Sequence, residues 1–257
     1  MPEFQQQMCA LVTGSTRGIG SAIALQLAER GCRVAIHGSS DIEVARGVCA
    51  ALPGSNHHAV AGDLSTLQGC KSVFTDALRG LGKVDLLFLN AGIYSQHAIN
   101  GCDLDTWHAA WSETVRVNLL GASYISKLTV DEWLSRPERG GGGRIFAIGS
   151  RGATRGEPYA PAYAASKAGL VAMVQSLAIA LGPHGAIASA VAPGVVETDM
   201  TRSVLAGPRG DQLRAESPLG RVATSGEIAS IAVWLALDAL PIISGSVVDA
   251  NGASHLR

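Results

Sequence analysis

Short apolar runs that are typical of strands alternate with helical stretches along the whole chain, and this alternation restricts the fold more than any other feature. Seven such runs are present, at residues 10–12, 33–36, 59–61, 84–89, 144–148, 186–191 and 246–248. Parallel strands need long crossover connections, usually helices, which then cover both faces of the sheet. The pattern therefore predicts an α/β fold with a doubly wound, seven-stranded parallel sheet.

One domain accounts for the whole pattern. A chain of 257 residues, of which 47% are apolar and 16% charged, can bury a large core as a single α/β unit. We expect residues 8–257 to form that domain and the polar segment 1–7 to be flexible. The glycine-rich tract 137–143 predicts a further flexible loop before the fifth strand.

The first strand leads into a glycine-rich turn. Leu11 and Val12 precede the sequence Thr13-Gly14-Ser15-Thr16-Arg17-Gly18-Ile19-Gly20, and an apolar helical pattern follows from Ala22. In a strand–turn–helix unit of this kind the backbone approaches a pyrophosphate closely, and free N–H groups at the helix N-terminus face the anion. The turn therefore predicts a dinucleotide site.

A hydroxyl, a phenol and an ammonium group recur near the middle of the chain. Ser150 follows a strand-like run, Tyr163 comes thirteen residues later and Lys167 four residues after that. On a helix, Tyr163 and Lys167 would share one face, roughly 5–6 Å apart at Cβ. A nearby cation favours phenolate and moves its titration toward neutral pH, so the tyrosine can exchange a proton with a substrate. An amphipathic turn with a solvated lysine is the alternative that this spacing alone leaves open.

Together, these motifs resemble the short-chain dehydrogenase/reductase family over nearly the whole chain. The turn has the spacing Gly-x-x-x-Gly-x-Gly, and Ser150, Tyr163 and Lys167 match the family's catalytic trio. Asn118 is similar to its active-site asparagine. Two further matches follow in family order, Asn90-Ala91-Gly92 and Pro193-Gly194-Val195-Val196-Glu197-Thr198. The resemblance implies a single Rossmann-like domain with strand order 3-2-1-4-5-6-7.

The resemblance also implies a mechanism with roles for four residues. Hydride moves reversibly between nicotinamide and a carbonyl or secondary alcohol. Tyr163 exchanges the proton and Ser150 donates a second hydrogen bond to the same oxygen. Lys167 holds the nicotinamide ribose and lowers the pKa of Tyr163, and Asn118 holds a water that links the lysine to solvent.

The cofactor residues that the resemblance implies are scattered over several segments. They are Gly14, Ser15, Thr16, Arg17, Gly18, Ile19, Gly20, Ser39, Asp63, Leu64, Asn90, Ala91, Gly92, Tyr163, Lys167, Pro193, Gly194, Val196 and Thr198. The second strand ends without a carboxylate before Asp41, which is typical of a helix N-cap. Since an Asp or Glu at the strand end binds the ribose of NAD, its absence beside Arg17 and Ser39 favours NADPH/NADP, with NAD as the alternative.

Among family members, the chain looks most similar to the β-ketoacyl-carrier-protein reductase branch and related carbonyl reductases. This implies an NADPH-dependent ketoreductase acting on a 3-oxoacyl thioester or a small ketone. Ile179 and His184 stand where that branch carries carrier-docking arginines, which argues against an acyl carrier protein. For Arg151 and Arg155 two interpretations stay open: they contact an anionic substrate, or they are solvated loop charges. Residues 200–217 are expected to form a substrate lid.

Two alternatives stay open. One is an NAD(P)-dependent alcohol, polyol or hydroxysteroid dehydrogenase, and the other is a non-catalytic dinucleotide-sensing or scaffold protein. A sensor would need none of the proton-handling groups Asn118, Ser150, Tyr163 and Lys167, so their joint presence favours an enzyme.

Charge and composition exclude several other classes. A net charge of −1 favours neither nucleic acid nor an anionic membrane as a partner. The five cysteines include no Cys-x-x-Cys pair and predict reduced thiols, and the spacing of the seven histidines predicts no metal site. We also expect that no apolar run reaches the length of a membrane span. The protein is therefore expected to be soluble and cytoplasmic. The resemblance implies a homo-oligomer, either a dimer or a tetramer.

Overall fold

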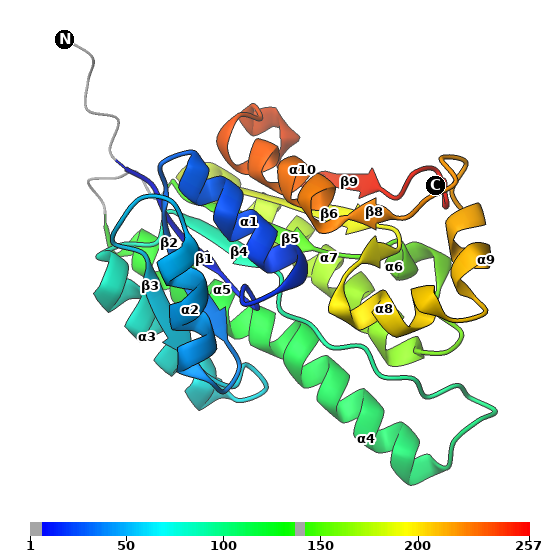
Figure 1. Cartoon of the computed structure of the whole chain (residues 1–257). Helices are drawn as coiled ribbons and strands as arrows, with labels where there is room; N and C mark the ends of the chain where they lie inside the picture. The colour runs from blue at the N-terminus through cyan, green and yellow to red at the C-terminus, as the bar shows by residue number, and fades with distance from the viewer. Residues whose placement is uncertain (1–6, 137–141) are drawn as a thin grey trace.

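The computed structural model describes residues 7–136 and 142–257, and within these ranges it shows the predicted doubly wound architecture (Figure 1). A seven-stranded sheet has the order β3-β2-β1-β4-β5-β6-β9, and each neighbouring pair of strands is parallel. The expected fold class and strand order are therefore confirmed. The segments predicted to be flexible, 1–7 and 137–143, fall mostly outside the described residues.

The strands of the sheet occur where the apolar runs predict them, with shifts of one or two residues at their ends. They are β1 Cys9–Val12, β2 Arg33–Gly38, β3 His58–Ala61, β4 Leu86–Leu89, β5 Arg144–Ile148, β6 Ile187–Pro193 and β9 Val247–Ala250. Every residue of β1, β4 and β6 is buried, as expected for strands covered on both faces. A second sheet of two strands, β7 Val196–Glu197 and β8 Ala223–Thr224, was not predicted, because two-residue strands leave no periodic pattern.

Helices cover both faces of the sheet (Figure 1). The longer ones are α1 Gly18–Glu29, α2 Ile42–Ala51, α3 Leu67–Leu81, α4 Leu104–Val115, α5 Ala122–Leu134, α7 Pro161–Leu181 and α10 Ser225–Leu237. The apolar residues of α1, α2 and α10 join one buried cluster with the strands, and those of α3, α5 and α7 join another. The shorter helices are α6 Gly152–Arg155, α8 Asp199–Ala206 and α9 Gly210–Ala215, and 3₁₀ turns span Gly182–His184 and Pro241–Ile243.

The helical region expected at residues 103–133 is interrupted. α4 ends at Val115, residues Arg116–Gly121 form a π-helical turn, and α5 begins at Ala122. Gly121 is packed so closely that a Cβ there would lie 2.3 Å from the carbonyl oxygen of Leu64. Asn118 is buried within the turn and binds backbone outside the helix. These tertiary contacts account for a π turn that propensity does not predict, and such turns often mark functional sites.

The longest helix is more apolar than the sequence analysis allows. The segment Pro161–His184 is long and apolar enough, by length and composition alone, to cross a membrane. The expectation that no apolar run reaches this length was therefore wrong. The same segment packs against β5 and β6 and includes the polar side chains of Tyr163 and Lys167.

Parallel strands place their carboxyl ends along one edge of the sheet, and the predicted motifs lie there. The glycine-rich turn follows β1, Asn90 follows β4, Ser150 comes two residues after β5, and Pro193 ends β6. In open α/β sheets ligands bind outside this edge, near the point where the strand order reverses. The reversal falls here between β1 and β4, so the fold gathers the motifs at the expected binding position.

Candidate active site

A cavity of about 1190 Å³ opens along this edge of the sheet. Nearly all of the predicted cofactor residues line it, together with Ser150, Tyr163 and Lys167. The exceptions are Ser15, Gly20 and Asn118, which are buried behind the cavity wall. The structure therefore brings the predicted cofactor and catalytic residues together. Most of them line the cavity, and the other three lie buried behind its wall.

The glycine-rich turn is shaped for close approach of backbone to a ligand. Gly14 and Gly18 have φ angles of +63° and +56°, a conformation that side chains with a Cβ rarely adopt. A Cβ at Gly20 would lie 2.4 Å from Nδ2 of Asn90. Arg17 is the N-cap residue of α1 but makes no side-chain cap, so N–H groups of the first turn remain for an anion. These residues fit the pyrophosphate of a dinucleotide.

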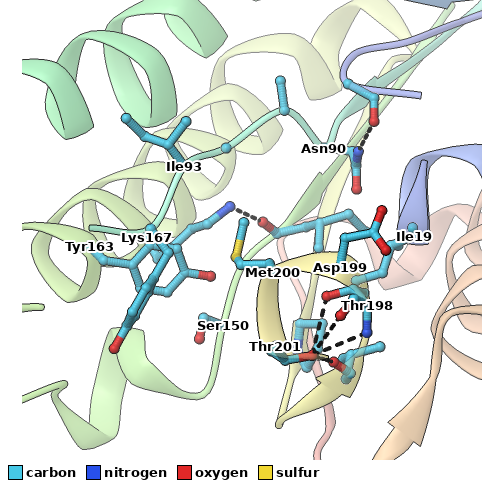
Figure 2. A pocket seen from close by; sticks show the side chains of 18 of the residues that line it. Ile19, Asn90, Ile93, Ser150, Tyr163, Lys167, Thr198, Asp199, Met200 and Thr201 are labelled. Atoms are coloured by element: carbon cyan, nitrogen blue, oxygen red, sulfur yellow. Dashed lines mark hydrogen bonds between the residues drawn. The ribbon is translucent and has the colours of Figure 1, made fainter. Parts of the chain in front are cut away.

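Asn90 joins the ends of β1 and β4. Its Nδ2 donates hydrogen bonds of 2.9 Å to the carbonyl oxygens of both Thr13 and Gly14. In return, the hydroxyl of Thr13 accepts hydrogen bonds from the N–H groups of Asn90 and Ala91, at 3.0 and 3.1 Å. Figure 2 shows the Asn90 amide reaching across to this turn. The Asn-Ala-Gly segment thus fixes the glycine-rich turn as well as lining the cavity.

His37, in β2, supports the same turn, and sequence reasoning did not assign it to the site. Nδ1 of its buried ring accepts a hydrogen bond of 2.9 Å from the N–H of Gly14, and Nε2 lies 2.9 Å from the carbonyl oxygen of Gly62. The N–H of Gly14 can only donate and the carbonyl oxygen of Gly62 can only accept, so the ring is neutral with its proton on Nε2. Burial lowers the pKa of His37. The one signal in the sequence was a titratable residue directly after the apolar run at residues 34–36.

We expect His37→Ala to lower the free energy of unfolding by about 1–3 kcal/mol at pH 8, because Gly14 and Gly62 lose a buried partner. Since the folded-state pKa is lowered, the unfolded chain takes up the proton first. The stabilisation is therefore complete above the unperturbed histidine pKa of about 6.5 and is lost as the pH falls. In urea unfolding, the difference in the free energy of unfolding between wild type and variant should become smaller as the pH falls from 8 to 5. A difference that grows over this range would contradict the assigned state of the ring.

Ser150, Tyr163 and Lys167 meet at one wall of the cavity, with Tyr163 and Lys167 on successive turns of α7 (Figure 2). Nζ of Lys167 lies 5.8 Å from the centre of the Tyr163 ring and donates a hydrogen bond of 2.7 Å to the carbonyl oxygen of Ile148. The hydroxyl oxygen of Ser150 accepts from the N–H of Gly152 at 3.0 Å, which leaves the serine proton available for another acceptor. Two hydroxyl groups and an ammonium group thus lie at the same wall of the cavity.

Burial dominates the electrostatics of this pair. It raises the pKa of Tyr163 to about 12, against the smaller opposite effect of the Ser150 hydroxyl, and it lowers the pKa of Lys167 to about 8. The expectation that Lys167 holds the pKa of the tyrosine below its usual value is therefore not met here. The physical reason is that both groups leave water together, while the ammonium group is directed at the Ile148 carbonyl. A buried phenol with a raised pKa is suited to keep its proton until an acceptor arrives.

Asn118 supports the site from behind. Its side-chain oxygen accepts from the N–H of Ile93 at 2.8 Å, and its Nδ2 donates to the carbonyl oxygen of Ile93 and to Oγ of Ser166, both at 3.0 Å. The amide therefore ties the loop after β4 to the helix that carries Tyr163 and Lys167. Its predicted part in holding a water stays a prediction.

Two arginines that the sequence offered to an anionic substrate are already paired. Arg151 is 4% exposed, and its guanidinium lies 2.5 Å from the carboxylate of Glu216, whose other oxygen lies 3.3 Å from Arg155. Glu216 follows α9, so this ion-pair group connects the residue after Ser150 to the segment 200–217. Both arginines therefore share one carboxylate, which offsets one of their two positive charges, and their contact with an anionic substrate stays a prediction.

The predicted lid at residues 200–217 consists of α8, α9 and their connection, and both helices reach the cavity. α8 begins directly after Thr198, whose N–H donates to Oγ1 of Thr201 at 3.1 Å. Figure 2 shows Thr198 and Thr201 joined in this way beside Met200. The predicted nicotinamide loop therefore leads straight into the lid.

The end of β2 carries no free acidic group toward the cofactor. Asp41 caps α2 by accepting a hydrogen bond of 2.8 Å from the N–H of Glu43, as predicted. Ser39, Ser40 and the exposed Arg17 line the cavity beside it. Within the described residues no group of three His, Cys, Asp or Glu side chains is arranged to hold a metal ion, and the five cysteines are free thiols.

An uncapped helix N-terminus after a glycine-rich turn, with a Tyr–Lys pair and a serine in the same cavity, defines the class of nicotinamide-dependent oxidoreductases. A family model described as Enoyl-(Acyl carrier protein) reductase matches residues 14–255. The chain belongs to the short-chain dehydrogenase/reductase family. It is accordingly an oxidoreductase that acts on alcohol and carbonyl groups.

Relatives with known names carry different activities. The chain is 32% identical to L-rhamnose 1-dehydrogenase (NAD(P)(+)) of Sphingomonas sp. (strain SKA58), over 96% of both chains. It is 33% identical to 3-oxoacyl-acyl-carrier-protein reductase of Escherichia coli (strain K12), over 96% of this chain and 97% of the other. A solved structure of 3-ketoacyl-(acyl-carrier-protein) reductase from Brucella melitensis, complexed with NADH, has a TM-score of 0.86 and 26% identity, over 97% of this chain and 98% of that one. These names support an enzyme over a dinucleotide sensor.

Proposed function

We propose that this chain is an NADPH-dependent ketoreductase that reduces a small ketone or a 3-oxoacyl thioester to the alcohol. The observation that carries the proposal is the placement of Ser150, Tyr163 and Lys167 in the cavity that the glycine-rich turn also lines. A carbonyl oxygen bound between the two hydroxyl groups would accept two hydrogen bonds as it becomes anionic. Such preorganised donors contribute several kcal/mol at a developing oxyanion.

In this proposal each of the four residues has a defined task. The bound nicotinamide supplies the hydride. Tyr163 donates its proton to the substrate oxygen, and Ser150 holds that oxygen in place. Lys167 anchors the cofactor ribose and remains close to the phenol. Asn118 keeps α7 and the loop after β4 in register, so that Tyr163 faces the substrate.

NADPH is proposed as the preferred cofactor, with NAD as the alternative. Asp41 is occupied as a helix cap, and Arg17, Ser39 and Ser40 offer a cation and two hydroxyl groups at the position of the extra phosphate. The similar Brucella structure contains NADH, so the preference needs measurement in this chain.

The proposal is tested by NADPH and NADH oxidation with a panel of simple ketones, acetoacetyl thioesters and keto-sugars, and by the reverse reaction with the matching alcohols. We expect turnover of at least one carbonyl class and a kcat/KM with NADPH at least about tenfold above that with NADH, because one added phosphate contact is worth about 1.5–3 kcal/mol. Turnover only in the oxidative direction would favour the dehydrogenase alternative. Tight NADPH binding with no turnover of any compound would refute the ketoreductase.

A homo-oligomeric state and a cytoplasmic location also belong to this proposal. Ile179, Trp234, Leu240 and Ile242 are exposed apolar side chains on the surface of the chain, with Ile242 at 92% exposure. Such residues are suited to contacts between copies in a dimer or a tetramer. Ile179 is exposed where the resemblance places a carrier-docking arginine, which weakens the case for an acyl carrier protein.

A further inference from the structure

The cavity contains a carboxylate, that of Glu157, which has no hydrogen-bond or ion-pair partner among the described side chains. We call the part of the cavity lined by Glu157, Tyr163 and Arg209 its substrate end. Glu157 follows α6 and lines the cavity, and no hydrogen bond or ion pair links its carboxylate to another side chain of the described residues. A Cβ at Gly152 would lie 2.8 Å from Cγ and 2.9 Å from Oε1 of Glu157, so the glycine provides the space in which this side chain rests. The absence of a side chain at Gly152 therefore leaves room for the carboxylate at the wall.

Glu157 also lies close to the reacting position. After burial, its charge is the next group that raises the pKa of Tyr94, and it raises the pKa of Tyr163 as well. The rings of these two tyrosines pack edge to face, with centres 5.2 Å apart. A substrate whose carbonyl oxygen meets Tyr163 would thus place its neighbouring atoms near Glu157.

The lid adds a cation that has no carboxylate partner among the described residues. The guanidinium carbon of Arg209, between α8 and α9, lies 4.6 Å from the centre of the Tyr159 ring. Burial raises the pKa of Glu157, and the charges of Arg151, Arg155 and, to a smaller extent, Arg209 act in the opposite direction. One free acceptor and one free donor therefore line the same end of the cavity.

We propose that this pocket selects a neutral, polyhydroxylated substrate, of the keto-sugar or polyol class, with Glu157 accepting from and Arg209 donating to its hydroxyl groups. The proposal rests on the carbonyl–alcohol chemistry proposed above and names its substrate class. A hydroxyl group both donates and accepts, so a chain of hydroxyl-bearing carbons satisfies both side chains at once.

Other substrate classes fit less well. An acyl chain would cover Glu157 without a hydrogen bond, which costs about 1–3 kcal/mol, or more for a charged group. A cationic substrate would meet Arg209 along with Arg151 and Arg155, whose charges Glu216 offsets only in part, and an anionic one would meet the carboxylate of Glu157 at the wall. Neutral hydroxyl groups avoid both conflicts.

The decisive measurement compares xylulose with 2-pentanone, which has five carbons but no hydroxyl groups, using NADPH and the full-length protein. We expect kcat/KM for xylulose to exceed that for 2-pentanone by about 10–100-fold, since a site built for hydroxyl groups rejects analogues that lack them. Glu157→Gln should reduce this ratio by about tenfold or more, and Arg209→Met by a smaller factor. Asp211→Asn, on the same lid but with a fully exposed carboxylate, should leave the ratio unchanged.

A second measurement does not depend on turnover. Xylitol should raise the melting temperature of the NADP⁺-bound wild type and of Asp211→Asn, and the increase should be lost in Glu157→Gln. If 2-pentanone is reduced as well as xylulose, the substrate class is wrong while the ketoreductase stands. If neither compound is reduced and xylitol gives no shift, the substrate class is wrong, and the ketoreductase is then decided by the wider panel with acetoacetyl thioesters. A xylitol shift without turnover of xylulose retains the binding site and refutes reduction of this substrate class.

Discussion

Replacing Tyr163 by Phe is expected to lower kcat for carbonyl reduction by a factor on the order of 10²–10⁴, which is the usual contribution of a positioned general acid. The change removes one oxygen atom and keeps the ring that packs edge-on against Tyr94. NADPH affinity and the melting temperature should therefore stay close to those of the wild type. The measurement is single-turnover NADPH oxidation at saturating substrate, together with cofactor titration by fluorescence.

A matched change at the neighbouring aromatic ring serves as the control. Tyr94→Phe removes a hydroxyl group from the same cavity wall and should reduce kcat far less, because we assign no proton transfer to Tyr94. Near-normal kcat in Tyr163→Phe would remove this residue from the role of acid. An equal loss in both variants would indicate a general effect on the pocket instead of a specific proton donor.

Replacing Lys167 by Met is expected to stabilise the cofactor-free protein while it abolishes most activity. Burial lowers the pKa of Lys167 from 10.5 to about 8, so carrying its charge at neutral pH costs up to about 3 kcal/mol, at about 1.4 kcal/mol for each pH unit. The loss of its hydrogen bond to the Ile148 carbonyl offsets part of this gain. We expect a net gain of about 1–2 kcal/mol at pH 7 and a kcat lower by about 10² or more.

The pH dependence separates this effect from simple repacking. With the folded-state pKa lowered, the unfolded chain binds more protons between pH 8 and 10.5, so the wild type becomes more stable as the pH rises through that window. The advantage of Lys167→Met should be complete below pH 8 and vanish toward pH 10.5. A constant difference across this range, measured by urea unfolding, would show that the lysine is not destabilised by its buried charge.

Much of the fold could be read from local patterns. Seven apolar runs separated by helices specify a parallel sheet, because strands buried on both faces need apolar residues at nearly every position. The short strands β7 and β8 were missed because two residues are too few to show a pattern. Their position depends on pairing between segments that are distant in the sequence.

The candidate site was only partly predictable. The glycine-rich turn, Asn90, Ser150, Tyr163 and Lys167 line one cavity, as their short spacing to the ends of strands indicates, and their roles stay predictions. The roles of the remaining groups depend on contacts between distant segments. Asn118 binds the backbone of Ile93, and Glu216 pairs with both Arg151 and Arg155 from 65 and 61 residues away.

The sequence by itself determined the class of sheet, the glycine-rich turn and the recurrence of Ser150, Tyr163 and Lys167 near the middle of the chain, because each of these is encoded in residue type at short spacing. Only the tertiary structure decided the charges inside the cavity. Burial sets the pKa values of Tyr163, Lys167 and His37, and pairing decides which of the lid's charged groups remain available to a substrate. Both depend on which segments exclude water around a group, and no local pattern carries that information.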